Sequence, residues 1–137
     1  MLLQTDDLET KRLFHGSAGS KESRIFILTD TWDYSEHKHQ VPFVNAAGDL
    51  LQKLLQSAGI NLADCFRSTL LPLVPPMNNI ANLFEQTPSL PPLHGLYPTE
   101  LVRQHVTRIW DQIEHVKPQL IIALGNYAFW ALSRESH

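Results

Sequence analysis

The fold is indicated by a short stretch near the start of the chain, Arg24-Ile25-Phe26-Ile27-Leu28-Thr29-Asp30. Four apolar residues follow one another in it, and polar residues stand on both sides. An uninterrupted apolar run of this length is typical of a strand that is buried on both faces. Strands of that kind belong to parallel sheets, in which helices form the connections. The stretch therefore predicts an α/β protein.

Helices and strands alternate along the rest of the chain, as a parallel sheet with right-handed crossovers requires. We expect a three-layer α/β/α sandwich with a short parallel sheet, and ligands beyond the carboxyl ends of its strands. That edge would carry Asp30, Thr69 and Gly125. The expected elements after the first strand are a helix containing Leu50–Ala58 and capped near Gly59, a strand over Ser68–Leu73, a helix from about Thr99 to Val116, a strand over Gln119–Gly125 and a helix that begins at Asn126.

The domain is expected to begin at about residue 24 and to run to residue 137. Residues 1–23 are mostly polar and are interpreted as a leader with one short helix around Leu8–Leu13. The polar segment 31–40 and the proline-rich segment Val74–Pro98 are interpreted as loops, and a loop as long as the second is usually functional or mobile.

Composition excludes several classes of protein. The 137 residues carry 11 Lys and Arg against 14 Asp and Glu, a net charge of −3 with seven neutral His, so overall charge would not hold the chain on nucleic acid. A single cysteine, Cys65, excludes a disulfide framework, a zinc ribbon and a Cys-ligated iron–sulfur cluster within the chain. The longest apolar run is far too short to span a membrane, and we expect a cytoplasmic protein with no membrane partner.

Three segments together resemble the uracil-DNA glycosylase superfamily, and in particular its family 4 branch and related phage proteins. Val41–Leu51 is similar to the pattern P-F-V-G-x-A-G-x-L-L, and Pro75–Asn79 is similar to P-P-G-N-R. Lys117–Ala128 is similar to R-P-x-V-I-V-x-L-G-x-x-A. Each segment alone is weak, but their order and spacing are moderately specific, and the resemblance runs from about Arg24 to Leu132.

The resemblance implies an enzyme that flips a base out of DNA and hydrolyses its N-glycosidic bond. It places Asp30 near the attacking water, where a carboxylate can orient the water and offset positive charge on the sugar. It places Phe43 against the flipped base and Thr69 where the family has an Asn that reads the uracil edge. From the residues alone, Asp30 is equally suited to cap a helix or stand in a loop, and Phe43 to anchor a helix entry in the core.

Further contacts to DNA are expected from the segments around these positions. Trp32 and Tyr34 are candidates for stacking on a base, and Lys38 and His39 for contacts to the backbone. Asn78 and Asn79 are further candidates for phosphate contacts, although turn formation explains them as well. No metal site is predicted, because the two histidines of segment 31–40 have no matching distant pair.

The chain also departs from the family pattern. The family opens its first loop with G-E-x-P-G, whereas this chain has Thr29–Asp33, so the glycines that let a ligand approach the backbone are absent. Thr69 offers one hydroxyl in place of an amide, which weakens the expected selectivity for uracil. The cluster cysteines are absent as well; they would fall near Leu73 and near Gln104 or His105, so no cofactor is expected.

The family's H-P-S motif and its last strand lie beyond the third helix and have no counterpart before His137. Either the chain is a fragment of a longer protein or it is a shortened relative. The exposed sheet edge would then be covered by a homodimer, a missing segment or a bound partner.

Three functions remain open at this point. The first is a uracil-DNA glycosylase-like protein that hydrolyses the N-glycosidic bond of a flipped uracil-type base when active. The second is an inactive relative that binds uracil-containing or single-stranded DNA as a replication or repair accessory module, which the charge of −3 mildly favours. The third, a binder of small nucleotide ligands, lacks any G-x-G-x-x-G or P-loop signature and ranks last.

Overall fold

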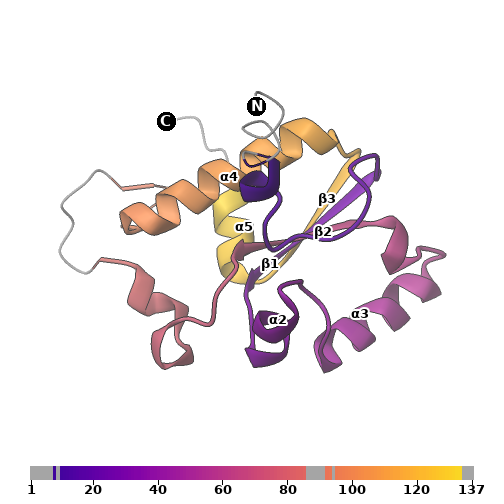
Figure 1. Cartoon of the computed structure of the whole chain (residues 1–137), viewed down its shortest axis with the longest axis horizontal. Helices are drawn as coiled ribbons and strands as arrows, with labels where there is room; N and C mark the ends of the chain where they lie inside the picture. Colours follow the sequence, from indigo (N-terminus) through magenta and orange to yellow (C-terminus); the bar gives the residue numbers. More distant parts are fainter. Residues whose placement is uncertain (1–7, 9, 86–91, 94, 134–137) are drawn as a thin grey trace.

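The computed structural model describes Leu8 and residues 10–85, 92–93 and 95–133. Three strands form one parallel sheet in the order β2-β1-β3 (Figure 1). They are β1 (Ile25–Thr31), β2 (Phe66–Leu71) and β3 (Leu120–Leu124). The apolar run at residues 25–28 is thus the central strand, and the prediction of an α/β fold with a short parallel sheet is confirmed.

Helices cover both faces of this sheet. Helices α4 (Glu100–Val116) and α5 (Asn126–Leu132) pack on one face, where Phe26 and Leu28 of β1 enter the larger apolar cluster. Helix α3 (Ala46–Ser57) lies on the other face, where Ile27 joins a smaller cluster with Leu55, Leu62 and Cys65. Successive residues of β1 therefore point to opposite layers, as the pleat of a strand demands. The three-layer arrangement follows from this alternation.

The register of the strands aligns their carboxyl ends at one edge of the sheet. Thr29 of β1 stands opposite Thr69 of β2 and Leu124 of β3. Asp30, near the end of β1, and Gly125, directly after β3, therefore lie at the same edge, as expected for parallel strands. Short 3-10 turns complete the connections at η1 (Leu62–Asp64), η2 (Pro76–Asn78) and η3 (Ile80–Leu83).

Segment 31–40, expected as a loop, contains a short helix, α2 (Tyr34–His39). Asp33 and Glu36 form a reciprocal capping box: the Asp33 Oδ1 accepts from the Glu36 N–H at 2.9 Å, and the Glu36 Oε1 accepts from the Asp33 N–H at 3.0 Å. Glu36 is the only buried residue of this helix, so the helix has no apolar stripe that the sequence could reveal. Strand β2 also begins at Phe66, two residues earlier than expected.

The segment before residue 24 packs against the sandwich in its described part. Residues 10–13 are helical, as expected for the short helix near Leu8–Leu13. Ala18 forms an antiparallel bridge with Arg67 at the edge of β2. Phe14 contacts Phe66 edge to face, with ring centroids 5.8 Å apart. These residues therefore cover the outer edge of β2 and add to the core.

Candidate functional site at the carboxyl edge of the sheet

Asp30 lies at the end of β1 and caps helix α5. Its Oδ1 accepts a hydrogen bond from the Ala128 N–H at 2.6 Å, and the Tyr127 N–H also contributes to its environment. A carboxylate at a helix N-terminus satisfies N–H groups that have no partner within the helix and interacts favourably with the helix dipole. The contacts of Asp30 are therefore those of a helix cap, one of the roles considered for it from the sequence.

Partial burial raises the pKa of Asp30 above its usual value, although the backbone hydrogen bonds from Ala128 and Tyr127 oppose this effect. Desolvation disfavours the ionised form, whereas donors stabilise it. A half-buried carboxylate with fixed geometry can orient a water molecule and interact with developing positive charge. The contacts of Asp30 as a cap and this chemistry can coexist because a carboxylate offers several lone pairs.

Gly125 allows the carboxylate to lie where it does. Its φ is +128°, and a Cβ atom at this position would collide with the side chain of Asp30. Glycine is therefore required here by both the backbone conformation and the close approach of the carboxylate. This explains why glycine follows Leu124 in the segment Lys117–Ala128, which resembles the family pattern.

Phe43 has a left-handed backbone, with φ at +65°, and its ring packs on the smaller apolar cluster on the α3 side. Its N–H donates to the Glu36 Oε2 at 2.7 Å, and Glu36 is only 4% exposed. One buried carboxylate thereby binds both the start of α2 and the Phe43 backbone. A non-glycine residue persists in this conformation only when its surroundings hold it.

The same network continues into α3. The Asp33 Oδ2 accepts from the Asn45 Nδ2 at 2.8 Å, and the Asn45 Oδ1 accepts from the Gly48 N–H at 2.9 Å, so Asn45 caps the start of α3. A Cβ atom at Gly48 would collide with the Phe43 carbonyl group. Asp33, Glu36 and Asn45 are called the α2–α3 clamp below. The clamp fixes the peptide at Phe43.

Asp30 and Phe43 belong to different layers. Asp30 has the same parity along β1 as Phe26 and Leu28 and contacts α5. Phe43 contacts the cluster around Ile27 on the α3 side. The two side chains therefore approach the edge of the sheet from its two faces, and a shared cleft for one base is not formed by their described contacts.

Trp32 and Thr69 are buried, with exposed fractions of 2% and 0%. The Trp32 Nε1 donates to the Thr69 Oγ1 at 2.9 Å, and the Thr69 hydroxyl donates to the Gly16 carbonyl at 3.4 Å. A side chain that stacks on or reads a base needs an accessible face or edge. In this conformation neither residue has one, so the geometry argues against the expected base contacts of Trp32 and Thr69.

The remaining expected DNA contacts are accessible. Tyr34 is 78% exposed at the start of α2, and Lys38 and His39 are exposed on the same helix. Asn78 and Asn79 are exposed in the turn after β2. The His39 ring contacts the Ser35 carbonyl, with 2.8 Å between its Nδ1 and that oxygen. These residues lie in helix α2 and in the turn after β2, the segments that follow the neighbouring strands β1 and β2.

Arg108 lies beneath this edge and was not identified from the sequence. Its Nη2 donates to the Thr69 carbonyl at 2.8 Å, its Nη1 to the His15 carbonyl at 3.1 Å and its Nε to the His105 Nδ1 at 3.1 Å. Burial lowers the pKa of Arg108 to about 10, and burial and the guanidinium together lower the pKa of His105 to about 4. His105 is therefore neutral at pH 7 and can accept this bond. No local pattern marks the contacts with Thr69 and His15, because these residues lie far from Arg108 in sequence.

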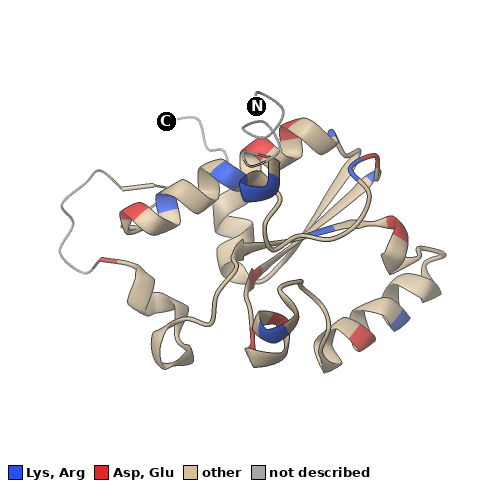
Figure 2. Cartoon of the chain, in the orientation of Figure 1, with Lys and Arg blue, Asp and Glu red and all other residues tan. Residues whose placement is uncertain are grey.

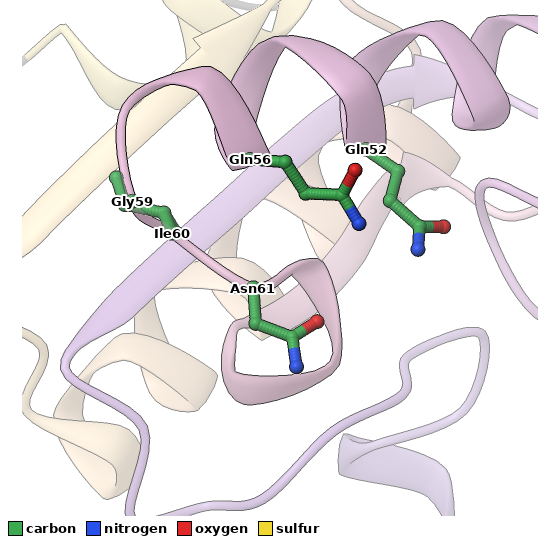
Figure 3. A pocket seen from close by; sticks show the side chains of 5 residues that line it. All are labelled: Gln52, Gln56, Gly59, Ile60 and Asn61. Atoms are coloured by element: carbon green, nitrogen blue, oxygen red, sulfur yellow. The ribbon is translucent and has the colours of Figure 1, made fainter.

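A hollow of about 420 Å³ lies at the other end of the sheet, between the end of α3 and the start of β2. It is lined by Gln52, Gln56, Gly59, Ile60 and Asn61, and Figure 3 shows the two glutamine amides on the same side of α3. Its side chains are uncharged, and it is far along the strands from Asp30. It offers no group for hydrolysis.

The iron–sulfur cluster implied by the family 4 resemblance does not fit this chain. Cys65 is the only cysteine, and it is buried just before β2, with its Sγ 3.6 Å from the Asn61 carbonyl oxygen. Cluster ligation by thiolates requires several cysteines. Among the described residues no group of three or more His, Cys, Asp or Glu side chains is placed to hold a metal ion.

Across the described helices, none has the length and apolar character needed to cross a membrane.

Comparison with known proteins agrees with this fold. The family model described as the uracil DNA glycosylase superfamily matches residues 17–137. A curated relative, the Type-4 uracil-DNA glycosylase of Archaeoglobus fulgidus, is 29% identical over 120 residues, which cover 88% of this chain and 52% of the relative. The chain therefore spans about half the length of that relative. It belongs to the uracil-DNA glycosylase superfamily.

Proposed function

We propose that this protein is a uracil-DNA glycosylase-like DNA-processing protein that hydrolyses the N-glycosidic bond of a flipped uracil-type base. Membership of the superfamily and the name of the Archaeoglobus relative support a reaction of this class. The observation that carries the proposal within the chain is Asp30, a half-buried carboxylate held at the carboxyl edge of the central strand. Ligands of open parallel sheets bind at that edge.

In this reaction the oxygen of a water molecule bonds to C1′ of the sugar, the bond from C1′ to the base nitrogen breaks, the base leaves with the bonding electron pair, and Asp30 accepts the proton that the water loses. Ionised Asp30 orients the water and stabilises the positive charge that develops on the sugar. Phe43 is the candidate for contact with the base; because its ring and Asp30 approach the edge from the two faces of the sheet, the nucleotide would have to extend across this edge to meet both. Tyr34, Lys38, His39, Asn78 and Asn79 are the candidates for contacts with the surrounding DNA.

A second candidate function is DNA binding without base excision. One observation favours it: the Trp32 indole lies against the Thr69 hydroxyl, and both are buried. The position that the family resemblance assigns to base reading is thus filled by the chain's own side chain. Excision would require either displacement of Trp32 or a base that is read by other groups.

Incubation of the protein with a uracil-containing oligonucleotide tests the first function and separates it from the second. We expect abasic sites in single-stranded or duplex substrate, and a loss of about 10²-fold or more in the Asp30→Asn variant, as for other general-base groups. Lys53→Gln, on the exposed side of α3, is the matched control and should retain the wild-type rate. Binding without abasic-site formation, equal in wild type and Asp30→Asn, would favour the second function.

A further inference from the structure

Met77 is an exposed apolar side chain on a strained backbone. It is 93% exposed, more than any other large apolar residue that the structure describes. Its φ and ψ are 56° and 24°, in the left-handed region, and the φ of the next residue, Asn78, is 54°. This conformation costs a non-glycine residue about 1–2 kcal/mol. Because the Met77 side chain is exposed, burial of apolar surface does not offset this cost.

Hydrogen bonds within the turn hold the backbone at Met77. The Asn78 N–H donates to the Pro75 carbonyl at 2.9 Å, and the Asn79 N–H donates to the Pro76 carbonyl at 3.1 Å. The Asn82 Nδ2 also donates to the Pro76 carbonyl, at 2.9 Å. Two prolines precede the turn and restrict its backbone further. The side chain at its tip is therefore presented on a stiff support.

The turn lies at the edge of the sheet to which the DNA function is assigned. It follows β2 by a few residues, and the Trp32 N–H donates to the Leu73 carbonyl at 3.1 Å, which ties the start of this loop to the one after β1. In Figure 1 the turn and α2 project on the lower side of the view, past the ends of β1 and β2. Residues 70–84 include no Lys, Arg, Asp or Glu, so the turn neither attracts nor repels a phosphate backbone by formal charge.

We propose that Met77 is an apolar wedge that enters the base stack of bound DNA beside the nucleotide that the protein engages; this rests on the proposed DNA function. Proteins that unstack DNA insert side chains such as Met, Leu, Ile or Phe between base steps. Methionine is unbranched and polarisable, which suits contact with aromatic rings. The exposed amide of Asn78, next along the chain, is positioned to donate to phosphates that flank the opened step.

Fluorescence of 2-aminopurine placed next to a central uracil in duplex DNA tests the wedge, because the fluorophore brightens when it is unstacked. We expect wild-type protein and Met77→Leu to raise the fluorescence, and Met77→Gly to lose this rise and to bind about tenfold more weakly. Leu54→Ala, which removes another exposed apolar side chain from α3, should behave as wild type. Met77→Gly should also melt at the wild-type temperature or above it, because glycine accepts the left-handed backbone without strain.

Three outcomes would overturn the proposal. If wild type and Met77→Gly both bind DNA and raise the fluorescence equally, Met77 is not a wedge, and the proposed function is unaffected. A lower melting temperature of Met77→Gly would mean that the side chain stabilises the fold. Absence of DNA binding by the wild-type chain even at low salt would reject the wedge and the proposed function together.

Discussion

At the scale of single residues, Asp30 combines a structural contact with a protonation equilibrium that the fold shifts. Burial raises its pKa, so the folded chain binds a proton at Asp30 more tightly than the unfolded chain does. The sign follows from this: above the folded pKa the ionised group lowers the stability of the fold, and this cost is relieved as the pH falls through that pKa. Excision has the opposite dependence, because it requires the ionised carboxylate.

We therefore expect Asp30 to stabilise wild type relative to Asp30→Asn increasingly as the pH is lowered from neutral to about 4, since the amide does not titrate. The measurement is the difference in melting temperature between the two proteins across this range. Uracil excision by the wild type should decline over the same range while the protein remains folded. If the melting temperature of the wild type instead fell relative to that of Asp30→Asn towards acid pH, the backbone hydrogen bonds, rather than burial, would dominate the pKa of Asp30.

Glu36 is the residue on which the α2–α3 clamp depends. It accepts from two backbone N–H groups, those of Asp33 and Phe43, and is almost fully buried. Glu36→Gln replaces one acceptor oxygen by a donor that faces an N–H group, and a buried polar group without a partner costs about 1–3 kcal/mol. We expect this loss in the free energy of unfolding, measured with a chemical denaturant.

The matched control is Lys38→Gln, an exposed change on the same helix, which should alter stability by less than about 0.5 kcal/mol. If Phe43 contacts the base, Glu36→Gln should also weaken DNA binding through the altered Phe43 backbone. Wild-type stability in Glu36→Gln would mean that the clamp does not hold the peptide at Phe43.

At the scale of elements, the junction between β3 and α5 depends on a glycine for two separable reasons. Gly125→Ala introduces both an unfavourable φ and a collision with the side chain of Asp30, whereas Gly59→Ala introduces only the φ, because nothing lies within 4 Å of a Cβ there. We expect Gly59→Ala to cost about 1 kcal/mol and Gly125→Ala clearly more. Denaturant unfolding of the two variants measures the difference, and equal costs would show that Asp30 moves aside freely.

Helix α4 holds the segment before β1 against the sheet. Gln112 is fully buried; its Nε2 donates to the Leu13 carbonyl at 2.6 Å, and its Oε1 accepts from the Ser68 hydroxyl at 2.6 Å. Gln112→Leu leaves the buried Ser68 hydroxyl and the partly buried Leu13 carbonyl without these bonds, so we expect a loss of about 2–4 kcal/mol and faster proteolysis near Leu13. Gln104→Leu, on the exposed side of the same helix, is the control and should preserve both properties. Unchanged cleavage in Gln112→Leu would show that other contacts hold the segment.

At the scale of the whole molecule, the fold was more predictable from sequence than the site. Apolar runs predict strands directly, because burial on both faces leaves a local signal in residues such as Phe26 and Ile27. Helix α2 left no such signal, since its buried residue is the charged Glu36. The site depends on contacts between distant residues: Trp32 meets Thr69, and Asp30 meets Ala128. Their positions in the chain were predictable, but the partners that bury or orient them were not.

The distribution of charge determines how strongly DNA binding should depend on salt concentration. Figure 2 shows Lys and Arg of the described residues on α2, α3, α4, β2, the short helical turn before β1 and the loop that leads into β1 rather than gathered at the carboxyl edge of the sheet, and the whole chain has a net charge of −3. DNA binding by this chain should therefore involve few phosphate contacts. Because each neutralised phosphate contributes about −0.9 to the slope of log K against log salt concentration, we expect a slope of only about −1 to −3 in a binding titration. A slope near about −6 would reveal a basic surface that this arrangement does not contain, and Lys38→Gln should reduce the slope by about one contact if that side chain meets a phosphate.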